Sequence, residues 1–432
     1  MFFKLQIIYF LVRIKLRDLF RNRAQIEHFQ QRRWHRFART ILPKSTFYRS
    51  YLNVPLDQIP LMHKALFMEH FDEINTVAIR KEEAMKITLQ AEETRDFASE
   101  LNGITVGLST GTIGTPGLFL ASTKERAQWV AMVLHRVVKW SIFKRQKVAF
   151  FLRANSNLYS SVQSSVLAFH LFDIFRKTEE LVAELDLLKP DIVAAQPSLL
   201  RYLAEAQQIG NLSIRPQQII SFAEVLHDDD RTVIERVFGL KITEVYQCTE
   251  GFLGVSCAYV TMHLNEDVAI FEKKYVSKHR FIPIVTDFTR TSQPIIRYEM
   301  TDVLVERTTP CPCGSAMMGI ERIEGRTDDV LLFEQDGKTI SIFSDTLVRK
   351  IARATDDFSH YSIRQVTENR LEVAVETEPK SKAIVGQLIE TAILEVLEGQ
   401  GITNTVVIFT EEKVSEKGAK HRRVVRTFKK IL

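Results

Sequence analysis

Hydroxyl side chains and glycines gather in one short stretch of the sequence, Leu108–Pro116, which reads LSTGTIGTP. Glycine lets the backbone approach a ligand closely, and successive N–H groups can contact an anion, so such a loop can wrap a polyphosphate. No Gly-Lys-Ser/Thr closes the stretch, so it is not a Walker motif. An ordinary Gly/Ser/Thr turn is the alternative.

A second stretch, Glu244–Gly251 (EVYQCTEG), ends an apolar strand-like run. Ligands of open α/β sheets bind at the carboxyl ends of strands. There Tyr246 could stack on a base and Glu250 could hold Mg²⁺ beside phosphates. Ser221–Glu224 also ends an apolar run and could form another wall of the same pocket. A solvated Glu in a loop is the alternative.

Three further stretches carry charged groups at strand ends or near the C-terminus. In the first, an Asp that leaves a strand is a suitable bidentate acceptor for two ribose hydroxyls. The stretches are Pro283–Asp302, Ile320–Asp329 (IERIEGRTDD) and Ser415–Arg423 (SEKGAKHRR).

Three thiols and one imidazole form a candidate metal site: Cys257, His263, Cys311 and Cys313. Zn²⁺ prefers tetrahedral sulfur and nitrogen ligands, and a closed set of four is structural rather than catalytic. Cys-x-Cys departs from the commoner spacing, so reduced, buried thiols without metal are the alternative. We expect Cys248 not to be a ligand.

Alternating strands and helices must position these groups. Helical stretches such as Glu125–Lys139 separate the apolar runs, which indicates an α/β architecture with a largely parallel sheet. The expected strands are Val148–Leu152, Ile192–Ala195, Ile219–Phe222, Ile242–Tyr246 and Phe281–Thr286.

After Arg326 the pattern changes to a short βαβ-type series, with helices expected over Ser344–Ala354 and Lys382–Glu398. Its expected strands are Val330–Phe333, Leu371–Val375 and Thr405–Phe409. The polar, glycine-bearing join at Gly325–Asp329 predicts a domain boundary. We therefore expect a large N-terminal domain over residues 1–327 and a small, mobile C-terminal α+β domain over residues 328–432.

Composition narrows the class of protein. The chain has 432 residues, 45% of them hydrophobic, and a formal charge of +5. That small net charge gives no warrant for nucleic-acid binding, which needs a concentrated basic face. Four cysteines in a chain this long do not make a disulfide scaffold. We expect a cytoplasmic globular protein.

Residues 1–23 combine apolar side chains with Lys4, Arg13, Lys15 and Arg17. Their longest uncharged run, Leu5–Val12, is far short of the roughly 20 apolar residues of a membrane span. We expect a basic helix packed on the body of the protein. The alternative is an interfacial helix on an anionic membrane or against a partner.

Together, in this order, the stretches resemble the acyl-adenylate-forming (AMP-binding) superfamily. The branch they resemble is that of phenylacetate–CoA ligase and the deazaflavin-coenzyme adenylating synthetases. The resemblance runs from about residue 40 to the C-terminus. Its strongest strings are LSTGTIGTP, VYQCTEG, TSQPIIRYEMTD, CPCG and ERIEGRTDD.

The resemblance implies a role for each matching residue. Tyr246 matches the adenine-stacking aromatic, Thr249 the α-phosphate contact and Glu250 the Mg²⁺ ligand. Asp302 matches the ribose aspartate. The other matches are the ATP-phosphate loop at Ser109, Thr110, Gly111, Thr112 and Gly114, the segment beside the adenine at Ala223 and Glu224, an arginine near the ribose and phosphates at Arg326, and the hinge at Asp328.

The catalytic lysine of the family precedes a basic tail, and alignment of that tail favours Lys420 over Lys417. Some positions depart from the pattern. Thr115 stands where many relatives have Lys, Gln247 where Gly is usual, and YEMTD where relatives have Tyr-Arg-Thr-Gly-Asp. The branch also has a Cys and a His after the tyrosine motif and a Cys-Pro-Cys-Gly before the hinge, which favours structural Zn²⁺ on the Cys/His set.

The function implied by the resemblance is ATP-dependent adenylation of a carboxylic acid, aromatic or otherwise apolar, with release of pyrophosphate. The acyl group would then pass to the thiol of CoA or of carrier-protein phosphopantetheine. A degenerate, non-catalytic nucleotide-binding protein on the same fold is the alternative. A homodimer and a membrane or partner contact through residues 1–23 are kept open.

Overall fold

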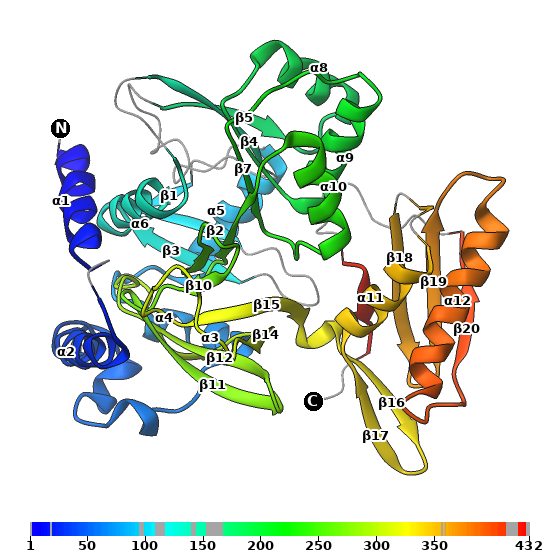
Figure 1. Cartoon of the computed structure of the whole chain (residues 1–432). Coiled ribbons are helices and arrows are strands. Elements are labelled where there is room, and N and C mark those ends of the chain that lie inside the picture. The colour runs from blue at the N-terminus through cyan, green and yellow to red at the C-terminus, as the bar shows by residue number, and fades with distance from the viewer. Residues whose placement is uncertain are drawn as a thin grey trace. The chain divides into compact units, whose positions relative to one another are not determined.

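The computed structural model describes residues 2–17, 20–94, 99–108, 117–139, 144–152, 167–355, 357–358, 360–411 and 422–428 (Figure 1). The chain folds into two compact units. The first comprises residues 1–274, 283–300 and 306–321, and the second comprises residues 275–282, 301–305 and 322–432. Within the described ranges, no helix combines the length and the apolar character needed to cross a membrane.

The first third of the chain is mainly helical. Its elements are α1 (Phe2–Arg17), α2 (Arg23–Ile41), the 3-10 helices η1 (Leu42–Lys44), η2 (Tyr48–Tyr51) and η3 (Leu56–Gln58), α3 (Lys64–Glu69), α4 (Phe71–Ile74), α5 (Lys81–Thr94), the strands β1 (Glu100–Leu101), β2 (Ile104–Leu108) and β3 (Leu118–Ser122), and α6 (Thr123–Arg136).

The middle of the chain alternates strands with helices and then continues as strands. Its elements are β4 (Gln146–Leu152), β5 (Leu167–Asp173), α8 (Thr178–Leu188), β6 (Ile192–Ala195), α9 (Pro197–Gln208), β7 (Gln218–Phe222), α10 (Asp228–Phe238), β8 (Ile242–Gln247), β9 (Phe252–Ser256), β10 (Met262–Leu264), β11 (Ala269–Ser277), β12 (Arg280–Asp287), β13 (Ile295–Glu299), β14 (Asp302–Glu306) and β15 (Gly319–Arg326).

The long sheet has the order β11-β12-β14-β15-β10-β9-β8-β7-β6-β4-β5, and β13 pairs with β12. Its parallel part runs from β5 to β8, and helices α8, α9 and α10 pack on it (Figure 1). All four residues of β6 are buried. Because both faces of such a parallel strand are covered, its sequence is a continuous apolar run.

Helix α6 begins with a capping box. The Glu125 backbone N–H donates to Ser122 Oγ, and the Glu125 carboxylate accepts from the Ser122 backbone N–H. The side of α6 that carries Ala127, Ala131 and Met132 packs against α1, which lies beside it in Figure 1. The helix expected over Glu125–Lys139 is therefore present, but it begins two residues earlier and ends three residues earlier.

The end of the chain forms the second unit's own small sheet. Its strands have the order β20-β19-β18-β21, and β16 and β17 form a separate hairpin. The helices expected at Ser344–Ala354 and Lys382–Glu398 are present with those bounds, and they cover an apolar core. The elements are the 3-10 helix η4 (Thr327–Asp329), β16 (Leu331–Gln335), β17 (Lys338–Ile342), α11 (Ser344–Ala354), β18 (His360–Thr367), β19 (Arg370–Glu376), α12 (Lys382–Glu398), β20 (Val406–Phe409) and β21 (Val424–Arg426).

Candidate active site and metal centre

Part of the expected site lies outside the described residues. This applies to Lys417 and Lys420, and to the glycine- and hydroxyl-rich loop. Strands β2 and β3, which flank that loop, are antiparallel partners, with Leu108 opposite Leu118. The loop residues in question are Ser109, Thr110, Gly111, Thr112, Gly114 and Thr115.

The tyrosine motif ends strand β8 and turns back into β9. Tyr246 is buried and lies opposite Gly254. The register shifts after Tyr246, and the Cys248 N–H donates to the Gly251 carbonyl at 3.0 Å, which closes a tight turn. Thr249 and Glu250 therefore lie in the turn that follows a strand, where ligands of α/β sheets bind.

Glu250 is held from two sides. The Thr249 hydroxyl donates to Glu250 Oε2 at 2.9 Å. The hydroxyl of Tyr298, on β13, also hydrogen-bonds to the Glu250 carboxylate. Burial raises the pKa of Tyr298, and the nearby charge of Glu250 raises it further, so Tyr298 remains a neutral donor. The group offers hard oxygen atoms of the kind that Mg²⁺ prefers.

Ala223 and Glu224 follow β7, and the chain turns there through a left-handed residue. Ala223 has φ = 70°, a conformation that non-glycine residues seldom adopt. Glu224 Oε2 accepts from the backbone N–H of Ser198 at 3.3 Å, near the start of α9. A carboxylate near a helix N-terminus stabilises the helix, so Glu224 has a structural partner in addition to its expected place beside the adenine.

Asp302 and Arg326 lie close together in the second unit. Asp302 begins β14, Arg326 ends the neighbouring β15, and Arg326 Nε lies 3.7 Å from Asp302 Oδ1. The Thr327 N–H donates to the Thr301 carbonyl at 2.7 Å, which holds the two strand ends in register. The predicted ribose aspartate and the predicted arginine are therefore brought together.

Asp328 lies within η4, and its side chain is outside the description. Its neighbour Asp329 accepts a hydrogen bond from Arg422 Nε at 2.7 Å. Burial raises the pKa of Asp329, while the Arg422 guanidinium opposes that rise. Arg422 therefore fixes the chain two residues after Lys420 to the expected hinge turn.

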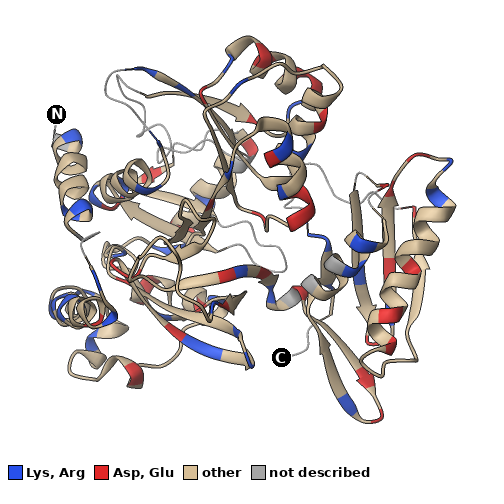
Figure 2. Cartoon of the chain, viewed as in Figure 1, with Lys and Arg blue, Asp and Glu red and all other residues tan. Residues whose placement is uncertain are grey.

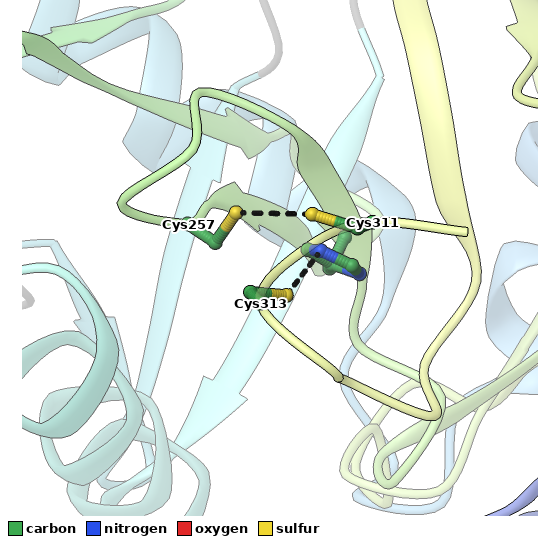
Figure 3. Close-up of side chains that lie close together, drawn as sticks. Cys257, Cys311 and Cys313 are labelled. Carbon is green, nitrogen blue, oxygen red and sulfur yellow. Dashed lines mark hydrogen bonds between the residues drawn. The ribbon is translucent and has the colours of Figure 1, made fainter. Parts of the chain in front are cut away.

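The four expected metal ligands do converge. Their ligand atoms all lie within 4.8 Å of one another, and Figure 3 shows the three cysteine side chains gathered at this point. Cys257 Sγ lies 3.6 Å from Cys311 Sγ, and Cys313 Sγ lies 3.3 Å from His263 Nε2. A tetrahedron with zinc–sulfur bonds of about 2.3 Å has edges of about 3.8 Å, so these separations fit a zinc set.

The imidazole and one thiol of this Cys/His cluster have surroundings that favour the protonation states in which they bind a metal. His263 Nδ1 lies 3.0 Å from the Met317 carbonyl, which favours a proton on Nδ1 and leaves Nε2 as the ligand. Burial disfavours the Cys311 thiolate, but hydrogen bonds from Thr261 and from the Cys313 backbone lower the pKa of Cys311 to about 6. A thiolate is the form that binds zinc.

The Cys/His cluster depends on two tight turns. Cys257 and His263 belong to the β9–β10 hairpin, where the Cys257 N–H donates to the Thr261 carbonyl at 2.9 Å. Gly314, at φ = 73°, closes the Cys-Pro-Cys-Gly turn, and its N–H donates to the Cys311 carbonyl at 3.1 Å. One local turn therefore brings Cys257 and His263 together, and the other brings Cys311 and Cys313 together.

Several residues that support the site carry no role in the sequence prediction. Tyr298 stands inside a quoted motif, but only the fold shows that it reaches Glu250. Glu125 could have been found, because Ser122-x-x-Glu125 before an apolar run is a capping-box pattern. Its buried carboxylate also accepts from the backbone N–H and hydroxyl of Thr291 and of Ser292.

Two of the unusual residues in the motifs have partners. Gln247, where Gly is usual, accepts from Trp129 Nε1 at 3.0 Å. Glu299, the acidic residue of YEMTD, forms an ion pair with Lys274 at 2.8 Å.

Of the aromatic residues near the carboxyl end of β4, Phe151 is buried and stacks on Phe172, so it belongs to the core. Phe150, half-buried, stacks on Phe222.

Comparison with known proteins supports the resemblance. No family model matches the chain. Protein CapK of Staphylococcus aureus is 26% identical over 214 residues, which cover 48% of this chain and 45% of that protein. Phenylacetate-coenzyme A ligase of Thermus thermophilus is 22% identical over 246 residues, which cover 50% of this chain and 52% of that enzyme. The chain thus spans about half the length of the curated relatives it matches.

Solved structures show the same fold. 2-Hydroxyisobutyryl-CoA ligase in the postadenylation state has a TM-score of 0.62 at 18% identity, over 93% of this chain and 88% of that one. Anthranilate CoA ligase AuaEII, in complex with anthranoyl-AMP, has a TM-score of 0.53 at 12% identity, over 74% of this chain and 65% of that one.

The fold is that of the acyl-adenylate-forming ligases, and the predicted fold class is confirmed. The curated proteins that match the chain in sequence include a phenylacetate-coenzyme A ligase and Protein CapK.

Proposed function

We propose that the protein is an ATP-dependent ligase that adenylates a carboxylic acid and transfers the acyl group to a thiol. The observation that carries the proposal is the group of Thr249, Glu250 and Tyr298 on the fold of the acyl-adenylate-forming ligases. It gives the expected cation ligand a fixed orientation at the end of a strand.

In the first half-reaction, a carboxylate oxygen of the acid attacks the α-phosphorus of ATP, the bond to the β-phosphate oxygen breaks, and pyrophosphate leaves. Glu250 would hold Mg²⁺, which when bound offsets phosphate charge. Thr249 contacts the α-phosphate and Tyr246 stacks on the adenine. Lys420 donates to the oxygens on which charge develops in the transition state.

Asp302 accepts from the ribose hydroxyls, and Arg326, 3.7 Å away, sets the orientation of that carboxylate. The remaining nucleotide contacts are assigned by the motif match. They are the hydroxyl loop of Ser109, Thr110, Gly111, Thr112 and Gly114, and the segment Ala223–Glu224.

In the second half-reaction, a thiol sulfur attacks the acyl carbon, AMP leaves, and the thiol proton is released. CoA is the thiol proposed, because CoA accompanies an acyl-AMP in a structural neighbour, 2-hydroxyisobutyryl-CoA ligase at a TM-score of 0.53. Carrier-protein phosphopantetheine is the second acceptor. We propose that residues 328–432 turn about Asp328 between the two half-reactions and carry Lys420 away.

For the acid we propose an apolar or aromatic one. The stacked pair of Phe150 and Phe222, whose ring centroids are 5.2 Å apart, supports this choice. Phe222 directly precedes Ala223, so an aromatic ring lies next to the proposed adenine segment.

We also propose that Cys257, His263, Cys311 and Cys313 hold structural Zn²⁺. Four protein ligands leave no open position, so the metal would stabilise the fold rather than take part in the reaction.

ATP–pyrophosphate exchange tests the proposed function. Pools of aromatic, aliphatic and amino acids are screened with the wild type, Lys420→Ala and Lys417→Ala. We expect exchange with one pool, and loss of exchange in Lys420→Ala only. Loss in Lys417→Ala alone would correct the alignment of the tail. ATP binding without exchange in any pool would favour the degenerate nucleotide-binding protein.

A further inference from the structure

The positive charge of the chain is concentrated at its N-terminus. Residues 1–50 contain twelve Lys and Arg but only two Asp and Glu, a net charge of +10. The whole chain carries +5, so the other 382 residues carry −5. Figure 2 shows Lys and Arg along α1 and α2, the helices that make up most of this segment. Such asymmetry indicates an anionic partner for the N-terminal segment.

Helix α1 has two apolar faces, and the residues that the structure describes cover one of them. One face packs into the core beside α6 through Phe3, Ile7, Phe10, Leu11 and Ile14. The opposite face forms an exposed apolar stripe, in which Leu5, Val12 and Leu16 are 56%, 57% and 62% exposed. The full stripe is Leu5, Ile8, Tyr9, Val12 and Leu16.

Cations border the exposed apolar stripe. At about 100° per residue, the stripe occupies an arc of about 100° around the helix. Lys4 and Lys15, both exposed, lie along one edge of that arc, and Arg13 lies along the other. The Arg13 guanidinium donates to the Tyr9 hydroxyl at 2.8 Å, so this edge is ordered. An apolar face bordered by Lys and Arg is the pattern of helices that lie in the plane of a membrane surface.

A basic pocket opens beside the exposed apolar stripe. It has a volume of about 360 Å³ and is formed by α1, α2, α6 and the segment that follows β12. The cationic side chains that line it are Arg13, Arg33, Arg36, Lys44 and Lys124.

The pocket and the stripe belong to one surface, because Tyr9 is part of both. Glu125 is the acidic residue of the pocket lining, and its carboxylate oxygens accept hydrogen bonds from Ser122, Thr291 and Ser292. The pocket therefore presents an excess of positive charge.

We propose that this surface binds an anionic lipid bilayer. Helix α1 lies in the membrane plane with the exposed apolar stripe among the acyl chains, and the basic pocket receives the phosphate of a lipid headgroup. An apolar stripe would have no counterpart on a nucleic acid, and a +10 segment is repelled by the same segment of a second copy. An anionic membrane satisfies both features. The inference does not depend on the proposed ligase activity.

Vesicle flotation of the full-length chain tests the proposal. The probes are vesicles of phosphatidylcholine alone, and of phosphatidylcholine with about 30% phosphatidylglycerol, in low and high salt. We expect binding to the anionic vesicles that falls by about tenfold or more in high salt or on neutral vesicles.

Val12→Glu breaks the stripe, and Arg36→Glu with Lys44→Glu reverses charge in the pocket; each is expected to weaken binding by about tenfold or more. The matched controls are Leu187→Glu, at an 86% exposed position of α8, and Lys278→Glu with Lys338→Glu, which make the same charge change elsewhere. All variants should keep the wild-type thermal unfolding midpoint.

Three results would overturn the proposal: no binding to anionic vesicles, equal loss in the matched controls, or full binding by Val12→Glu. Sedimentation velocity measures the oligomeric state and so tests whether a second copy of the chain covers the stripe instead. A wild-type dimer that Val12→Glu converts to a monomer, without any change in vesicle binding, would assign the stripe to a second copy instead.

Discussion

Glu250 receives hydrogen bonds from Thr249 and Tyr298, so its carboxylate has a fixed orientation before any ligand binds. Replacement by Gln keeps the size but removes the charge that a divalent cation needs. We expect Glu250→Gln to lower ATP–pyrophosphate exchange by about a hundredfold or more.

Tyr298→Phe removes only an orienting hydrogen bond, so the expected loss of exchange is smaller, about tenfold. The Mg²⁺ concentration for half-maximal exchange should rise in both variants. Glu180→Gln, on the exposed side of α8, is the matched control and should behave as the wild type. If Glu250→Gln leaves both the exchange rate and its Mg²⁺ dependence unchanged, Glu250 is not the Mg²⁺ ligand.

Asp287 is a buried carboxyl at the end of β12. Burial raises its pKa to about 6, although the N–H of Thr289 and the charge of Arg290 oppose the rise. The folded state therefore binds the proton more tightly than the unfolded chain. This contribution to stability is present in full below pH ~4 and is lost as pH rises through ~6.

Asp287→Asn stays neutral at every pH. We expect its free energy of unfolding, relative to that of the wild type, to increase by about 3 kcal/mol between pH ~4 and pH ~7. Urea unfolding across this range measures the difference. The exposed Asp57→Asn is the control. A wild-type-minus-variant difference that does not change with pH would mean that Asp287 titrates normally.

At the scale of elements, the start of α6 is linked to the segment between β12 and β13 by one carboxylate. Burial opposes the charge of Glu125, but Arg290 and the hydrogen bonds from Ser122 and Ser292 outweigh it and lower the pKa of Glu125. Glu125→Ala leaves several buried donors without an acceptor. We expect a loss of about 3 kcal/mol in the free energy of unfolding at neutral pH.

Ser122→Ala is the graded comparison for Glu125→Ala, because it removes the cap and one of the hydrogen bonds to the Glu125 carboxylate, and it should cost about 1 kcal/mol. Chemical denaturation of the three proteins at one pH gives both values. Equal losses in the two variants would show that the hydrogen bonds from Thr291 and Ser292 contribute little.

Gly325 precedes the expected hinge and has φ = 129°. A Cβ atom there would lie 2.7 Å from Asp329 Oδ2, so Gly325→Ala strains the backbone and displaces the Asp329 carboxylate. The expected cost is about 3 kcal/mol.

Gly337, in the β16–β17 turn, also has a positive φ, but its Cβ would meet open space. Gly337→Ala should therefore cost only about 1 kcal/mol, and thermal unfolding compares the two variants. Equal costs would mean that the contact with Asp329 does not matter.

The strands that the sequence predicts best are those with continuous apolar runs. β6 has its predicted bounds, and β4, β7 and β8 extend their predicted runs by only one or two residues, because burial on both faces leaves little choice of residue. β18 could not be found in the same way. It reads HYSIRQVT, and its buried Gln365 bonds to the N–H and carbonyl of Leu332 rather than to water.

Side-chain roles were harder to predict than strands. The Cys/His cluster could be predicted, since the residue types and the family resemblance together indicated a ligand set. The contacts of Glu250 with Tyr298 and of Glu224 with Ser198 join segments that are 48 and 26 residues apart, so only the fold reveals them.

At the scale of the whole molecule, the proposed metal makes a prediction that does not depend on activity. We expect the purified protein to contain about one zinc ion per chain and to lose thermal stability when a chelator removes it. His263→Asn and Cys313→Ser should lower both the zinc content and the melting temperature. Cys248→Ser should change neither, because Cys248 lies outside the Cys/His cluster. Metal-free protein with unchanged stability would favour reduced thiols.

The Cys/His cluster also joins distant parts of the chain, since Cys257 and Cys311 are 54 residues apart in sequence. A bound ion would close that stretch into a ring and so reduce the conformational entropy of the unfolded chain. In the loop-entropy model used for disulfides, this raises the free energy of the unfolded state by about 4 kcal/mol. The two pairs of ligands meet only after the strands between them have paired. Refolding should therefore begin at the same rate with and without zinc. Zinc should slow unfolding instead, because its bonds form only after the folding transition state.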